Sequence, residues 1–92
     1  MNYVDVMVEP TPNPNAFKFT LDRAVTESGS ESFANAEQAE ANPLAAKLFA
    51  LEGVQAVFFL NNFVTITRVP DQDWNALATD VVNVIQDHYE NA

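Results

Sequence analysis

Side chains that carry chemistry in enzymes and metal proteins are scarce in this 92-residue chain. It has no cysteine, which excludes disulfides, thiolate metal sites, cysteine nucleophiles and a cysteine-ligated iron–sulfur cluster. His88 is the only histidine, and no motif around it suggests a nucleophile–base pair. Gly29 and Gly53 are the only glycines, so there is no glycine-rich phosphate loop. We therefore expect that the protein is not an enzyme.

Acidic residues are the one reactive type in excess, with thirteen Asp and Glu against four Lys and Arg. Four glutamates fall between Asp22 and Asn42 and could bind a hard cation, iron included, through carboxylate oxygens. They lack the spacing of an EF-hand loop and have no histidine nearby, so a solvated loop is the competing interpretation. These glutamates are Glu27, Glu31, Glu37 and Glu40. For His88, a capping or surface role near a helix end is favoured over a ligand role.

The formal net charge of −9 also limits the partners. Such a surface repels phosphate backbones and anionic lipid, so we expect neither nucleic acid nor a membrane as partner. A basic protein partner is compatible with the charge, and so is a charge that only maintains solubility. The chain start has no signal-like apolar run, and no stretch approaches the roughly twenty apolar residues of a membrane span. We therefore expect a cytoplasmic protein.

The elements that must position these residues follow from the apolar pattern. With 48% hydrophobic residues, the chain predicts one packed domain over residues 1–92. Alternation of apolar and polar side chains predicts strands, and Phe33 anchors a further short one. The predicted strands are Tyr3–Glu9, Ala16–Leu21, Ser32–Ala34, Val54–Leu60 and Phe63–Val69.

Two helices are indicated by caps and apolar stripes. The first begins at Asn42-Pro43, carries an apolar stripe and stops at Gly53. Its stripe consists of Leu44, Leu48 and Leu51. The last helix is capped by Asp71 or Asp73 and runs to about Tyr89, and Ala36–Ala41 is expected to form a helical turn. The order β-β-β-α-β-β-α predicts an α+β two-layer sandwich, in which two helices cover one face of a mostly antiparallel sheet of four to five strands.

Asn61-Asn62 predicts a two-residue hairpin turn, which fixes the two faces of the sheet. In that register the core face is lined by Val57, Phe59, Val64 and Ile66. The other face carries Phe58, Leu60 and Phe63 among threonines. Either this second face is an exposed apolar patch for a partner or a second copy, or the segment Asp22–Asn42 folds over it.

The segment Pro10–Asn15 has proline at every second position, which makes it a stiff, donor-poor arch between two strands. Such a segment loses little entropy on binding, so the arch is a candidate recognition surface. The alternative is a structural corner in which the asparagines bond the local backbone. The candidate partner-binding residues are Pro10, Thr11, Pro12, Asn13, Pro14, Asn15, Lys18, Phe58, Leu60 and Phe63.

Glu9–Phe19 reads EPTPNPNAFKF and closely resembles the signature EPTPNPNxxKF of the N-terminal domain of Nfu/NifU-type scaffold proteins. Further segments resemble the family in the same order, so that the similarity covers about residues 3–89. They are Asn42–Ala45, Leu48-Phe49, Glu52–Val54, Val57–Phe59, Phe63–Thr67 and Asp73-Trp74.

In this family the domain usually precedes a second domain whose Cys-x-x-Cys motif binds and transfers a [4Fe–4S] cluster. The resemblance implies a stand-alone copy without that second domain, binding no cofactor directly. Its implied function is a non-catalytic accessory or docking module in iron–sulfur cluster assembly, with a cluster scaffold or an apo-client as partner. The alternative is a self-associating interaction or regulatory domain unrelated to cluster transfer, and both a monomer and a homodimer remain open.

Overall fold

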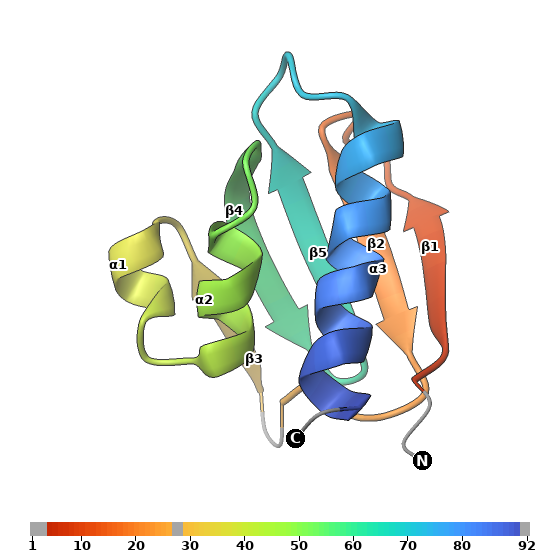
Figure 1. The fold of residues 1–92 in the computed structure, drawn as a ribbon, viewed down its shortest axis with the longest axis vertical. Helices are drawn as coiled ribbons and strands as arrows, with labels where there is room; N and C mark the ends of the chain where they lie inside the picture. The colour runs from red at the N-terminus through yellow and green to blue at the C-terminus, as the bar shows by residue number, and fades with distance from the viewer. Residues whose placement is uncertain (1–3, 27–28, 91–92) are drawn as a thin grey trace.

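A computed structural model describes residues 4–26 and 29–90, which form an antiparallel sheet of five strands and three helices (Figure 1). The strands are β1 (Val6–Pro10), β2 (Ala16–Leu21), β3 (Ser30–Phe33), β4 (Val54–Leu60) and β5 (Phe63–Arg68). The helices are α1 (Ala36–Ala39), α2 (Pro43–Phe49) and α3 (Trp74–Glu90). Their order across the sheet is β1-β2-β5-β4-β3, which leaves β1 and β3 at the two edges.

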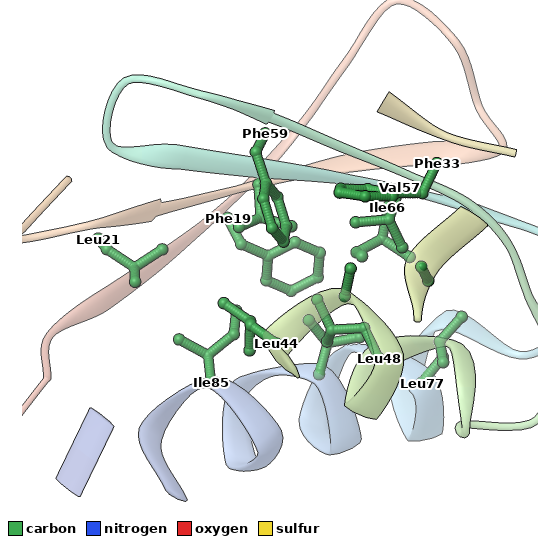
Figure 2. Packing of buried hydrophobic residues seen from close by; sticks show 14 of the residues in the cluster. Phe19, Leu21, Phe33, Leu44, Leu48, Val57, Phe59, Ile66, Leu77 and Ile85 are labelled. Atoms are coloured by element: carbon green, nitrogen blue, oxygen red, sulfur yellow. The ribbon is translucent and has the colours of Figure 1, made fainter. Parts of the chain in front are cut away.

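The helices α2 and α3 lie over the same face of the sheet (Figure 1). Between these two layers, Phe19 and Phe59 point from the sheet toward Leu44 and Leu48 of α2 (Figure 2). Ile85 of α3 lies on the helical side of the same core, as Leu44 does (Figure 2). All five side chains are essentially inaccessible to water. The predicted α+β two-layer fold is therefore confirmed for the described residues.

Each main helix begins where the sequence provides a cap. The Oδ1 atom of Asn42 accepts hydrogen bonds from the backbone N–H groups of Leu44 at 3.0 Å and Ala45 at 3.2 Å. In α3 the cap is Asp73, whose Oδ1 accepts from the N–H of Asn75 at 3.0 Å. These bonds satisfy donors that have no partner within a helix, and so they fix where each helix starts.

The β4–β5 hairpin has the predicted register. Leu60 lies opposite Phe63 and Phe59 lies opposite Val64, and Asn61 in the turn has a φ of 52°. Asparagine tolerates this left-handed backbone better than most residues do. Because Phe59 and Val64 are fully buried, the predicted choice of core face is also confirmed.

Several predicted boundaries are wrong. The first strand begins at Val6 rather than Tyr3, because the N–H of Asp5 bonds the carboxylate of Asp22 instead of a neighbouring strand. Tyr3 itself lies outside the described residues. The strand also extends to Pro10, which is tolerated since β1 is an edge strand.

The other boundary shifts lie around β3 and α2. The third strand occupies Ser30–Phe33, β5 ends at Arg68, and the expected helical turn is the separate short helix α1, which the predicted order omitted. The helix α2 ends at Phe49, well before Gly53. Gly53 has a φ of 97° in the turn that leads into β4, so its left-handed backbone serves that turn and not the helix end.

Candidate functional site

The sheet face turned away from α2 and α3 carries the first group of predicted site residues. Phe58, Leu60 and Phe63 project from this face and are partly exposed. The described part of the segment 22–42 does not cover them. It forms the edge strand β3 beside β4 and the helix α1, which packs against α2 and β3. Of the two alternatives drawn from the sequence, the structure therefore supports the uncovered face.

The register of the sheet brings Lys18 to the same face. Lys18 pairs with Thr65 across β2 and β5, and its Nζ lies 4.5 Å from the ring centroid of Phe63. The rings of Phe58 and Phe63 are 6.5 Å apart between centroids and tilted by 51°. We name Lys18, Phe58, Leu60 and Phe63 the open-face cluster. A cation over an aromatic face in a half-exposed setting contributes about 0.5–1 kcal/mol, enough to orient the lysine without burying it.

A shallow hollow of about 180 Å³ lies beside Phe58 on this face. Ala56, Thr65 and Thr67 form its floor, while Ser32 and Gln38 from the β3–α1 region form part of its wall. The alternation of β4 and β5 had placed the floor residues on this face, but nothing local marked them as a site. Ser32 and Gln38 carry no signal in the sequence, because only the pairing of β3 with β4 brings them here.

The arch Pro10–Asn15 is a separate feature, and it is held by its own polar groups. Thr11 Oγ1 donates to the carbonyl of Ala16 at 2.9 Å and accepts from the N–H of Asn13 at 3.1 Å. Asn13 Oδ1 accepts from the N–H of Asn15 at 2.9 Å. This geometry is that of the structural corner, although Pro12 and Pro14 stay exposed at its tip.

The arch is also clamped from the end of β5 and the start of α3. Arg68 Nε donates to Asn15 Oδ1 at 3.2 Å, and Trp74 Nε1 donates to the carbonyl of Pro14 at 3.2 Å. The Trp74 ring stacks on Phe17 with centroids 4.3 Å apart and lies 5.4 Å from the Arg68 guanidinium carbon. This clamp could not be predicted from the sequence, because its only local signal was a lone tryptophan at a helix start.

The arch and the open-face cluster do not form one site. Phe63 begins β5 and Arg68 ends it, so Phe63 and the arch-bound Arg68 lie at opposite ends of the strand. Figure 1 shows the same separation, with the β1–β2 connection and the β4–β5 turn at opposite ends of the sheet. A small partner surface would therefore contact either the arch or the open-face cluster.

His88 in α3 contacts Lys47 of α2, with Nδ1 and Nζ 3.1 Å apart. Burial lowers the pKa of His88 from its ordinary 6.5, and the Lys47 charge lowers it further while Asp87 opposes the change. A neutral ring that accepts a hydrogen bond from the ammonium fits this arrangement better than a charged cap. The contact with Lys47 on the surface between α2 and α3 is therefore the role that the geometry gives to His88.

The described residues offer neither a cluster of metal ligands nor a membrane-spanning helix. Within residues 4–26 and 29–90, no three histidine or acidic side chains gather in a way that could hold a metal ion. Across the same ranges, no helix has both the length and the apolar character needed to cross a bilayer.

Residues 6–92 match the model of a family described as "Scaffold protein Nfu/NifU N terminal". NifU-like protein 5, mitochondrial, from Arabidopsis thaliana is 37% identical over 86 residues, covering 94% of this chain and 31% of the relative. The human NFU1 iron-sulfur cluster scaffold homolog, mitochondrial, is 37% identical over 90 residues, covering 97% of this chain and 35% of that protein. The chain thus spans about a third of the length of these relatives.

Solved structures share the fold at lower identity. A NifU-like protein from Saccharomyces cerevisiae superposes with a TM-score of 0.84 at 21% identity, over 100% of this chain and 83% of the other. A Staphylococcus aureus protein superposes with a TM-score of 0.77 at 22% identity, over 88% and 98% of the two chains. At these identities the likeness supports the fold alone.

The names of the two relatives also correct one prediction. Both relatives are called mitochondrial, which contradicts the cytoplasmic location expected from the sequence. That expectation rested on the missing signal at the start of the chain, and such an absence does not determine the compartment.

Proposed function

Because this chain belongs to the scaffold protein Nfu/NifU N-terminal family, we propose that it is a non-catalytic docking module in iron–sulfur cluster assembly. In this proposal the module binds a cluster scaffold or an apo-client protein, and the cluster itself is carried by other cysteine ligands. The absence of cysteine from the chain supports this division of labour, because thiolates are the usual ligands of such clusters.

The observation that carries the proposal is the uncovered sheet face. Antiparallel sheets commonly leave one face to solvent, but that face is then mostly polar. Here Phe58, Leu60 and Phe63 occupy it, and Lys18 lies at their edge. Aromatic side chains are enriched at the centre of protein interfaces, whereas the rim is polar, so the grouped phenylalanines fit the centre of an interface and Lys18 fits its rim.

The arch takes a supporting part in the proposal. Its polar side chains are engaged by local bonds and by Arg68, so few donors remain for a partner. We therefore assign docking to the open-face cluster and assign the arch to fixing the ends of β1 and β2.

The test is a pull-down with the purified chain from an extract of its own cells, read by mass spectrometry. We expect the wild-type chain to recover cluster-assembly proteins or iron–sulfur clients. The double variant Phe58→Ser/Phe63→Ser should lose them, because it removes the aromatic part of the open-face cluster. Val69→Ser is a control for the loss of an exposed apolar side chain, since Val69 is 44% exposed and follows the end of β5, whereas Phe63 begins that strand.

Recovery of no cluster-assembly protein and no client by the wild-type chain would contradict the proposal. Equal recovery by the wild type and the double variant would reject the open face as the docking surface. Sedimentation of the purified chain tests the alternative of self-association. A stable homodimer that the double variant turns into a monomer would show that a second copy occupies this face.

A further inference from the structure

A second surface lies at the free edge of β1, which in the sheet order is separated by β2 from β5 and β4, the strands that carry the aromatic residues of the open-face cluster. The strand pairs with β2 on one side only, and no described element pairs with its outer side. Pro10 ends the strand and has no N–H, so the segment able to pair is Val6–Glu9. An unpaired strand edge is a template for another extended chain.

An apolar groove of about 460 Å³ opens beside this edge, between the β1–β2 strands and α3. Its apolar lining consists of Val8, Phe17, Trp74, Ala78 and Val82. The stacked pair of Phe17 and Trp74 gives it a rigid end. Figure 1 shows α3 running along the face of the sheet beside β2, with β1 next to it at the edge.

The edge itself is unusually apolar. Met7 is 62% exposed and Val8 is 39% exposed, although they are neighbours on one edge strand. Their side chains point to opposite faces, since successive residues of a strand alternate. In a chain added to β1, every second side chain would therefore point toward the groove. The side chains between them would point toward the face that carries Met7.

The outward charge along this edge is mostly negative. Glu9 shares the face of Met7, because it lies two residues further along the strand, and Asp5 directly precedes the strand. The helix α3 has no Lys or Arg, whereas Asp80, Asp87 and Glu90 lie on it.

Among the described residues, the cations near this edge are engaged elsewhere. Arg23 pairs with Asp22 at 3.0 Å, and Arg68 donates to Asn15 and to the Gln72 carbonyl. Lys18 is the cross-strand partner of Glu9, but its Nζ lies over the Phe63 ring. The carboxylate of Glu9 is oriented by Thr20 of β2, whose hydroxyl donates a hydrogen bond to Glu9 Oε1 at 3.3 Å. These groups favour a basic occupant.

A second copy of this chain fits the edge poorly. Antiparallel pairing of two β1 strands about Met7 would bring Glu9 of each copy to the start of the other strand, which Asp5 directly precedes. Like charges directly opposite one another destabilise a strand pair, and each copy carries a net charge of −9. The edge is therefore suited to a different chain.

We propose that the β1 edge and its groove bind an extended basic segment of a partner protein, which adds to the sheet as an outer strand. Apolar side chains at alternate positions of the segment enter the groove, and the lysines or arginines between them face Asp5 and Glu9. This surface is distinct from the open-face cluster, so it can be tested whether or not that cluster is the docking site.

The probe is a short synthetic peptide of alternating valine and lysine with blocked ends, titrated into the ¹⁵N-labelled chain and followed by NMR. We expect amide shifts to concentrate in Val6–Glu9 and in Trp74–Asn83. A peptide of the same composition with valines and lysines in two blocks should bind about tenfold more weakly, as should one with glutamate in place of lysine. Binding should also weaken as salt is added, because exposed charges are screened.

A pair of charge-reversal variants separates local charge from total charge. Asp5→Lys/Glu9→Lys should turn the preference toward the glutamate peptide. Glu37→Lys/Glu40→Lys changes the net charge equally but lies on and next to α1, near the opposite edge strand, and should keep the wild-type preference. An equal change of preference in both variants would overturn the proposal.

The wild-type titration decides the matter even if a variant fails to fold. Absence of binding, equal binding of the alternating and block peptides, or shifts centred on Phe58 and Phe63 would each overturn the proposal. Failure here leaves the open-face docking function untouched, because the pull-down variants change none of the residues at this edge.

Discussion

Arg68 and Asn15 are joined by two hydrogen bonds across 53 positions of sequence. The N–H of Arg68 donates to the carbonyl of Asn15 at 2.7 Å, and Nε donates to Asn15 Oδ1 at 3.2 Å. The same guanidinium donates through Nη1 to the carbonyl of Gln72 at 2.7 Å. One side chain thus connects the arch, the end of β5 and the turn before α3.

Replacing Arg68 should therefore destabilise the fold at one end. Arg68→Ala removes the bonds to Asn15 Oδ1 and the Gln72 carbonyl, and we expect unfolding to become easier by about 1–3 kcal/mol. Arg68→Lys keeps the charge but not the planar fork, so it should recover only part of the loss. Urea denaturation measures both variants. A loss below about 0.3 kcal/mol for the alanine variant would show that the clamp does not stabilise the fold.

Adjacent residues of β4 should respond very differently to truncation. Phe59 is fully buried, whereas Phe58 is partly exposed on the open face. We expect Phe59→Ala to lower the free energy of unfolding by about 3–5 kcal/mol, because it leaves a cavity. Phe58→Ala should lower it less, by about 1 kcal/mol, since part of the ring stays in contact with water in the folded chain. Comparable losses in thermal or urea unfolding would contradict the assignment of the two faces.

Gly53 should be difficult to replace for two separate reasons. Its φ of 97° is rarely adopted by residues with a side chain, and an added Cβ would overlap the side chain of Gln72. We expect Gly53→Ala to destabilise the chain by about 1–3 kcal/mol. The double variant Gly53→Ala/Gln72→Ala should regain the stability lost through the overlap with Gln72. It should not regain the stability lost through the unfavourable φ.

Gly29 provides the control for this pair. Its φ is 65°, but an added Cβ would meet nothing within 4 Å. Gly29→Ala should therefore show only the backbone effect, measured by the same denaturation. A double variant at Gly53 that is no more stable than the single one would rule out the overlap as a cause.

Stability should depend on the protonation of His88 in a defined pH window. Burial and then Lys47 lower its pKa in the folded chain, whereas in the unfolded chain it titrates near its ordinary 6.5. Below pH 6.5 and down to the folded pKa, the unfolded state therefore binds more protons. This contribution to stability is complete above pH 6.5 and is lost as the pH falls through that window.

The measurement is the free energy of unfolding against pH for the wild type and His88→Gln. The difference between the two curves removes the effect of the acidic residues that they share. We expect the wild type to lose stability relative to the variant as the pH falls below 6.5, and the His88 ring to titrate by NMR below 6.5. An NMR midpoint above 6.5 would contradict the neutral His88–Lys47 contact.

Local patterns predicted much of the fold. The alternation around Asn61-Asn62 gave the hairpin register and the core face, because a two-residue turn leaves only one pairing and strand side chains alternate strictly. The cap at Asn42-Pro43 gave the start of α2 for a similarly local reason. The ends of elements were less predictable. Asp5 lies outside the first strand, because its N–H bonds the side chain of Asp22, seventeen positions away.

The candidate site was only partly predictable. The sequence grouped Phe58, Leu60 and Phe63 on one face, since they follow from the β4–β5 register alone. Whether anything covered that face depended on where residues 22–42 went, and no local pattern fixes the position of an edge strand such as β3. Lys18 reached the cluster only through the pairing of β2 with β5.

The sequence by itself determined that this chain has no thiolate to hold a cluster, that it carries a strong negative charge, and that it resembles one family from the proline arch onward. These are properties of composition and order, which folding does not change. Only the tertiary structure decided that the arch is clamped by Arg68 and Trp74, that it lies apart from the open-face cluster, and that a groove flanks the β1 edge. Each of these depends on contacts between residues distant in sequence, and such contacts exist only once the sheet order is set.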